Sequence, residues 1–134
     1  MLLTTVFLVV LIANILATVY DVVKTEQGLK KGVGQEGNEI VTNLFGAKPG
    51  SLQLYLWNFV FTGAFSTAVI LWGFGPTSVL GLLSKGLFFS FIGVDAARHY
   101  LGGRLWDHLL TGKPLKKDRT AWEKFLGLGI DPVE

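Results

Sequence analysis

Residues 2–20, "LLTTVFLVVLIANILATVY", form an apolar run of nineteen residues that contains no charged side chain. A helix needs about 20 predominantly apolar residues to cross a hydrocarbon core about 30 Å thick. No basic residue precedes the run and no small-x-small cleavage signal precedes Asp21, which disfavours a secretory signal peptide. The run therefore predicts a retained membrane-spanning helix.

Two further segments have the same character. Residues 52–72 carry no charge over twenty-one positions, and residues 78–94 are apolar apart from Lys85. Half of the chain is hydrophobic and 16% is charged, whereas soluble domains have roughly a quarter of their residues charged. We therefore expect one small all-α integral membrane protein with three transmembrane helices plus interfacial amphipathic helices. The expected layout is a transmembrane domain at 1–101, with spans at about 2–23, 52–72 and 78–98 and an interfacial loop at 24–51, followed by an amphipathic basic tail at 102–134.

The basic residues predict an orientation. Eleven of the twelve Lys and Arg residues lie either in the loop after the first span or from Arg98, at the end of the third span, onward. Loops on the cytoplasmic side carry an excess of Lys and Arg. A multi-pass protein with its N-terminus outside and its C-terminus on the cytoplasmic side is the expectation.

Several functional classes are disfavoured. The net charge of +2 is too small for a nucleic-acid-binding protein, and the chain has no cysteine. Serine-hydrolase, zinc-protease, P-loop and dinucleotide-binding motifs do not occur, so we expect no enzyme. Asp95 and His99 have i, i+4 spacing, but two ligands are too few to predict a metal. No cofactor is predicted, and the alternative is a haem or chlorophyll-type pigment at His99.

Polar residues gather near the predicted inner membrane surface. Asp21 ends the first span while Asp95, Arg98 and His99 end the third, so these side chains should reach one level. They can be charges paired at the membrane edge, or they can form a shared functional site. We expect Arg98 to pair with Asp21, because a guanidinium can serve a carboxylate through two hydrogen bonds. The predicted polar cluster comprises Asp21, Thr25, Glu36, Asn38, Lys85, Asp95, Arg98 and His99.

Lys85 is unusual because it lies about 12 Å deep, counted from Thr77. A charged side chain at that depth costs at least about 2.5–3.5 kcal/mol. Its charge therefore needs a carboxylate brought by a re-entrant loop at 24–51, or a partner on another chain. The same loop contains an apolar stripe, residues 40–45, that predicts a short helix ending at Gly46.

The second span and the tail each carry a possible contact surface. Small-x3-small pairs in "TGAFSTA" let another helix approach closely, either within the chain or from another subunit. The pairs are Gly63 with Thr67 and Ala64 with Ala68. In the tail, residues 104–110 and 120–128 predict interfacial helices flanking a basic linker. The expected lipid or partner surface is Trp106, Lys113, Lys116, Lys117, Arg119, Trp122 and Phe125.

The pattern D-x3-T-x2-G-x3-G-x3-E-x-N follows the first apolar run. It is formed by Asp21, Thr25, Gly28, Gly32, Glu36 and Asn38. It resembles the small bacterial and archaeal multispanning proteins of the uncharacterised DUF5658 type over roughly residues 10–95. Glu39 stands where those proteins usually have proline, and the charged tail is outside the pattern. The resemblance implies a helical protein of a prokaryotic inner membrane, with Lys85 matching a lysine of a later span and with no assigned reaction.

Together these features favour a non-enzymatic accessory or assembly subunit of a larger membrane complex. One alternative is a small oligomeric transporter or ion-conducting protein that uses the Asp, Glu, Asn and Lys side chains as a polar path. Another is a haem- or pigment-binding subunit. The expected partners are the lipid bilayer and other membrane subunits or further copies of the chain, and no nucleic acid.

Overall fold

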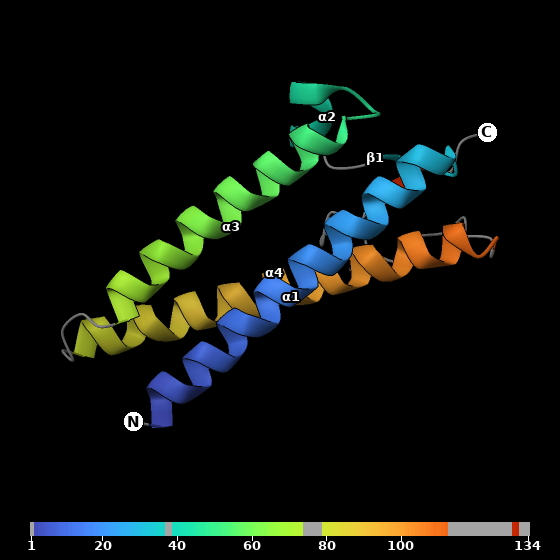
Figure 1. Ribbon diagram of the computed structural model, residues 1–134. Coiled ribbons are helices and arrows are strands. Elements are labelled where there is room, and N and C mark those ends of the chain that lie inside the picture. Colours follow the sequence, from blue (N-terminus) through green and yellow to red (C-terminus); the bar gives the residue numbers. More distant parts are fainter. Residues whose placement is uncertain (1, 37–38, 74–78, 113–129, 132–134) are drawn as a thin grey trace.

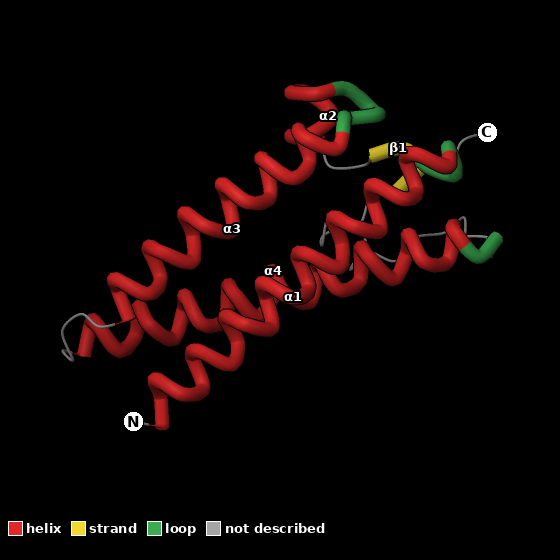
Figure 2. Tube along the Cα trace, viewed as in Figure 1, coloured by secondary structure: helices red, strands yellow, loops and turns green. Residues whose placement is uncertain are grey.

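The computed structural model describes residues 2–36, 39–73, 79–112 and 130–131, and its class is all-α (Figure 1). Two strands of two residues each form a small antiparallel pair, in which Gln35 is opposite Asp131 and Glu36 is opposite Ile130 (Figure 2). The elements are α1 (Leu2–Lys31), β1 (Gln35–Glu36), α2 (Glu39–Phe45), α3 (Ser51–Gly73), α4 (Val79–Leu110) and β2 (Ile130–Asp131).

The first and last long helices lie side by side and run in the same direction, while α3 runs back between them in the chain (Figure 1). With 30 and 32 residues, α1 and α4 are about 45 and 48 Å long at 1.5 Å per residue. Both are longer than a hydrocarbon core of about 30 Å. The first helix ends where Gly32 takes a φ of 67°, a left-handed conformation that glycine adopts without strain.

A seven-residue repeat of inward-facing positions joins α1 to α4, and we call this contact the α1–α4 seam. Three contacts across it join residues 78 apart, namely Asn14 with Ile92, Asp21 with His99 and Gly28 with Trp106. Such a constant offset means that the two helices keep one parallel register. A repeat of 3.5 residues keeps one stripe of each helix facing its partner. The seam comprises Leu11, Asn14, Thr18, Asp21, Thr25 and Gly28 of α1 and Ile92, Asp95, His99, Gly102 and Trp106 of α4.

Glycines bring the two backbones close together along this seam. A Cβ atom on Gly28 would collide with the ring of Trp106. At Gly102 the added atom would lie 2.8 Å from Oδ1 of Asp21. Small residues at a helix contact let the helices approach closely, which is the usual basis of helix packing in membranes.

A second, smaller cluster holds α2 and the beginning of α3 against α1. Val22, Val41 and Leu54 are buried there, with Phe45 and Trp57 packed around them. The tyrosine hydroxyl of Tyr55 also donates a hydrogen bond of 2.7 Å to Oε2 of Glu26. The short helix predicted at residues 40–45 is therefore present as α2, and it ends at Gly46 with a φ of 84°.

Among the described residues, many large apolar side chains are exposed, while three polar side chains are buried alongside six apolar ones. Asn14, Thr18 and Thr25 are buried with exposed fractions of 1, 4 and 5%, whereas Phe59 is 79% exposed and Leu87 73%. Large apolar side chains are exposed on all three long helices, and contiguous apolar surface of this kind marks a membrane or partner interface. Among the described residues one helix, Thr5–Lys31, is long and apolar enough to cross a membrane, and its most apolar stretch of 18 residues has a mean hydropathy of 2.4.

The tail differs from expectation where the structure describes it. Residues 104–110 continue α4 without a break instead of forming a separate interfacial helix. Trp106, expected on the lipid or partner surface, is 2% exposed and packs against Gly28, so that prediction is wrong. Because α4 continues through Gly102 without a break, the ring of Trp106 faces α1. The other members of the expected surface lie outside the described residues, namely Lys113, Lys116, Lys117, Arg119, Trp122 and Phe125.

Candidate polar site in the α1–α4 seam

The site begins with Asn14, the one amide side chain in the first apolar run. Its Nδ2 donates to Oδ2 of Asp95 over 3.0 Å and to the backbone oxygen of Ile92 over 3.3 Å. Thr18 donates through Oγ1 to the backbone oxygen of Asn14 over 2.9 Å. A buried amide must be hydrogen-bonded to avoid a large desolvation cost, and both donor hydrogens of Asn14 are used.

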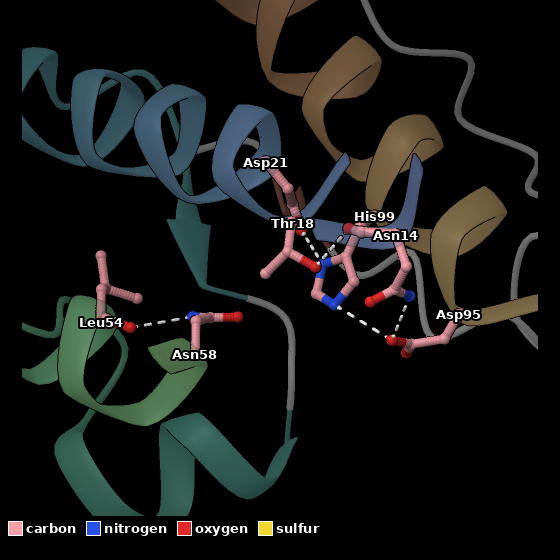
Figure 3. Close-up of polar contacts among 7 residues, drawn as sticks. All are labelled: Asn14, Thr18, Asp21, Leu54, Asn58, Asp95 and His99. Atoms are coloured by element: carbon pink, nitrogen blue, oxygen red, sulfur yellow. Dashed lines mark hydrogen bonds and ion pairs between the residues drawn. The ribbon is translucent and has the colours of Figure 1, made fainter. Parts of the chain in front are cut away.

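Next along the seam, His99 lies between two carboxylates (Figure 3). Its Nδ1 is 2.8 Å from Oδ2 of Asp21 on α1, and its Nε2 is 3.8 Å from Oδ2 of Asp95 on its own helix. Because a carboxylate accepts, the short contact places a proton on Nδ1. Asp21 therefore fixes the tautomer and the orientation of the ring, and Nε2 is directed at Asp95.

The helices position these groups through simple spacing. Asp95 and His99 are one turn apart on α4, and Asn14 and Asp21 are two turns apart on α1, so each pair shares a face. The carboxylate of Asp21 fits beside Gly102 because that position has no side chain. Thr25 follows one turn later on the same face and is 5% exposed.

A second polar contact joins residues of α1 on either side of Asp21 to Asp107, two turns beyond His99 on α4. Nζ of Lys24 is 2.7 Å from Oδ1 of Asp107, and the hydroxyl of Tyr20 donates to Oδ2 of the same carboxylate. The hydrogen bond from Lys24, and after it the one from Tyr20, hold the pKa of Asp107 below its ordinary value of 3.8. Lys24 also lies 5.9 Å from the centre of the Tyr20 ring. Our sequence analysis missed this contact, although the i, i+4 spacing of Tyr20 and Lys24 is a signal for it.

Of the predicted polar cluster, the structure brings together Asp21, Asp95 and His99, with Thr25 on the same seam. The expected pairing of Asp21 with Arg98 is wrong, because the partner of Asp21 is the His99 imidazole. Successive residues of a helix point about 100° apart, so His99 on the seam turns Arg98 away from it.

The remaining members lie elsewhere. Glu36 is in β1, beyond the end of α1, and its backbone N–H donates to Ala47 over 3.0 Å. Asp21 lies ten residues before the end of α1, about 15 Å along the helix. Lys85 is partly exposed and lies ten residues before Asp95, about 15 Å along α4. Asn38 lies outside the described residues.

The predicted packing face of the second span is open where it is described. Gly63 and Ala64 are exposed on α3, and a Cβ atom added to Gly63 would meet nothing within 4 Å. There is therefore open space beside Gly63 in the part of the chain that the structure describes. The side chains of Thr67 and Ala68 lie outside the described part of the chain.

The chemistry open to the seam is proton binding and helix pairing. An imidazole nitrogen can donate or accept a proton, and both ring nitrogens of His99 face carboxylates. Within the described ranges, no three His, Cys, Asp or Glu side chains are arranged to hold a metal ion. Ligation of a haem or pigment by His99 would require Nε2 to turn away from Asp95.

Comparison with known proteins adds no assignment to this geometry. No family model matches the chain, and neither a curated protein nor a solved structure matches it.

Proposed function

We propose that the protein is a three-span, non-enzymatic subunit of a larger membrane complex, with its N-terminus outside and its C-terminus on the cytoplasmic side. The observation that carries the proposal is the exposure of large apolar side chains on all three long helices, with polar side chains buried between two of them. Phe59 and Leu87 point outward, while Asn14 and Thr18 are buried. Lipid and neighbouring helices can cover the outer surface, and interhelical hydrogen bonds are the expected contents of the interior.

The second long helix supports the role of a subunit. α3 contacts α1 near Leu54 and Trp57, in its first two turns, and has few contacts with α4. Further along, Phe59 and Phe61 are exposed beside Gly63. Apolar side chains next to small residues suit a close contact with another membrane helix. We assign this contact to a partner subunit or a second copy of the chain.

The seam supports a structural role rather than catalysis. Asn14, Asp21, Asp95 and His99 contact one another across the seam. Paired polar groups between helices fix which faces meet and in which register. The motif resemblance to the DUF5658 type supports a prokaryotic inner membrane as the location within this proposal.

Co-purification and native mass test the subunit role. The tagged chain, extracted from its own membranes in mild detergent, is expected to carry a partner chain or further copies. Gly63→Leu should lose that partner, whereas Gly86→Leu should keep it, because Gly86 is also exposed with nothing within 4 Å of an added Cβ but lies on α4. Helicity and thermal unfolding check that both variants fold. A wild-type monomer, or equal loss in both variants, would contradict the proposal.

A proton conduit is the second candidate, because Asp95, His99 and Asp21 form a line of ionisable groups along the seam. Purified protein in liposomes would then move protons, as followed with an internal pH-sensitive dye. His99→Gln should abolish the flux. Flux indistinguishable from protein-free liposomes would remove this candidate, and flux unchanged by Lys85→Met would exclude the path through Lys85.

A further inference from the structure

A pocket of about 160 Å³ lies between the end of α1 and the beginning of α3. It sits beside the second cluster, at the end of the bundle where the basic loop joins the helices. Its lining combines charged groups at the rim with apolar groups below. The pocket is lined by Glu26, Leu29, Lys30, Lys48, Pro49, Gly50, Ser51 and Leu54.

The charges of the lining leave one cation available. Lys30 holds Oε1 of Glu26 through an ion pair of 2.6 Å, and Tyr55 donates to Oε2 of the same carboxylate. The carboxylate of Glu26 is therefore already neutralised. Lys48 is exposed, and its ammonium has no ion-pair partner among the residues that the structure describes. Since Lys30 compensates Glu26, the lining has one remaining positive charge at Lys48, which matches a ligand with a single negative charge.

The apolar part of the pocket lining indicates which chemical group accompanies the negative charge of the ligand. Leu54 is 2% exposed, and Pro49 is buried beside it. The pocket also lies where the predicted span 52–72 begins, the level at which lipid headgroups meet the hydrocarbon core. A small inorganic anion would gain nothing from the leucine and proline side chains. A phosphodiester followed by a glycerol backbone and acyl chains would contact both parts.

We propose that this pocket binds the phosphodiester of an anionic phospholipid headgroup, with Lys48 as the cation that meets the phosphate. The inference rests on the proposed insertion into a membrane and is independent of the subunit role. Lys30 holds Glu26 in place, which keeps the carboxylate from repelling the phosphate.

Native mass spectrometry of the detergent-solubilised full chain tests the proposal. Phosphatidylglycerol or phosphatidylcholine is added, and the lipid retained per protein is measured for the wild type, Lys48→Gln and the matched control Lys31→Gln. Lys31 is a neighbouring exposed lysine that does not line the pocket. The wild type should retain phosphatidylglycerol in preference, and Lys48→Gln should lower that retention about fivefold, the effect of one cation near an anionic surface. Lys31→Gln should change it little.

Three results would overturn the proposal. The first is equal retention of the two lipids by the wild type, and the second is equal loss in the two lysine variants, which would indicate diffuse attraction. The third is complete displacement of phosphatidylglycerol by inorganic phosphate at equal concentration, which would assign the pocket to the free anion. Failure of the protein to enter liposomes would instead contradict membrane insertion itself, so the two failures are distinguishable.

Discussion

At His99, an imidazole ring joins two helices by lying between Asp21 of one and Asp95 of the other. Removing either side of the short contact leaves a partly buried polar group without its hydrogen-bond partner. We therefore expect Asp21→Ala and His99→Ala each to destabilise the fold, with a coupling of about 0.5–3 kcal/mol between them. Unfolding by SDS titration in detergent micelles measures the cycle. The control pair, Asp21→Ala with Arg98→Ala, should be additive within about 0.5 kcal/mol, and coupling there instead would contradict the assignment.

Asp107 makes the second polar contact dependent on pH. Its folded pKa is lowered, first by Lys24 and then by Tyr20, so the contact stabilises the fold above the ordinary value of 3.8. That stabilisation is lost as the pH falls through the folded pKa. Asp107→Asn should be less stable than the wild type near neutral pH, and the gap should close in acid. Thermal unfolding across that range measures the difference, and a gap that persists unchanged in acid would show that the carboxylate charge is not responsible.

At the scale of the helices, the distance between α1 and α4 depends on glycine. Gly28→Ala should lower the free energy of unfolding by about 1–3 kcal/mol, because the new methyl group collides with Trp106. Gly86→Ala meets nothing within 4 Å and should be neutral or stabilising by up to about 1 kcal/mol, since alanine favours a helix. The same SDS titration compares the two variants. Equal effects would mean that the close approach does not limit the packing.

A feature that depends on neighbouring residues in the sequence can be predicted from the sequence, whereas a feature that depends on a residue of another helix cannot. The helix α2 can be predicted because its apolar stripe is a pattern of neighbouring residues in the sequence. Depth along a predicted span follows from counting residues, so the sequence predicts that Asp21 and His99 lie at one level. The direction in which a side chain points around its helix does not follow from depth. The sequence therefore predicts Arg98 as the partner of Asp21, whereas the partner is its neighbour His99. The predicted tail begins at Gly102, but α4 continues through that position, where the absence of a side chain makes room for Asp21.

For the molecule as a whole, the topology proposal gives a direct labelling experiment, because the chain contains no native cysteine. Lys31→Cys should react with an impermeant maleimide only after the cytoplasmic side is opened. Thr77→Cys, in the predicted turn between the second and third spans, should react from outside. The two cysteines should be labelled from opposite sides of the membrane, because one predicted span separates their positions. Labelling of both from the same side would contradict the three-span arrangement.

The lengths of α1 and α4 have a mechanical consequence. Each exceeds the hydrocarbon core by about 15 Å or more, and the contacts of Lys24 with Asp107 and of Gly28 with Trp106 clamp them together near their C-terminal ends. In the proposed membrane arrangement, the pair would act as a stiff lever whose fulcrum is the bilayer surface. A change in tilt, caused by bilayer thickness or by the proposed neighbouring subunit, would move the far end of this lever sideways. The small antiparallel pair of β1 and β2 is attached near that end, so it travels with the lever.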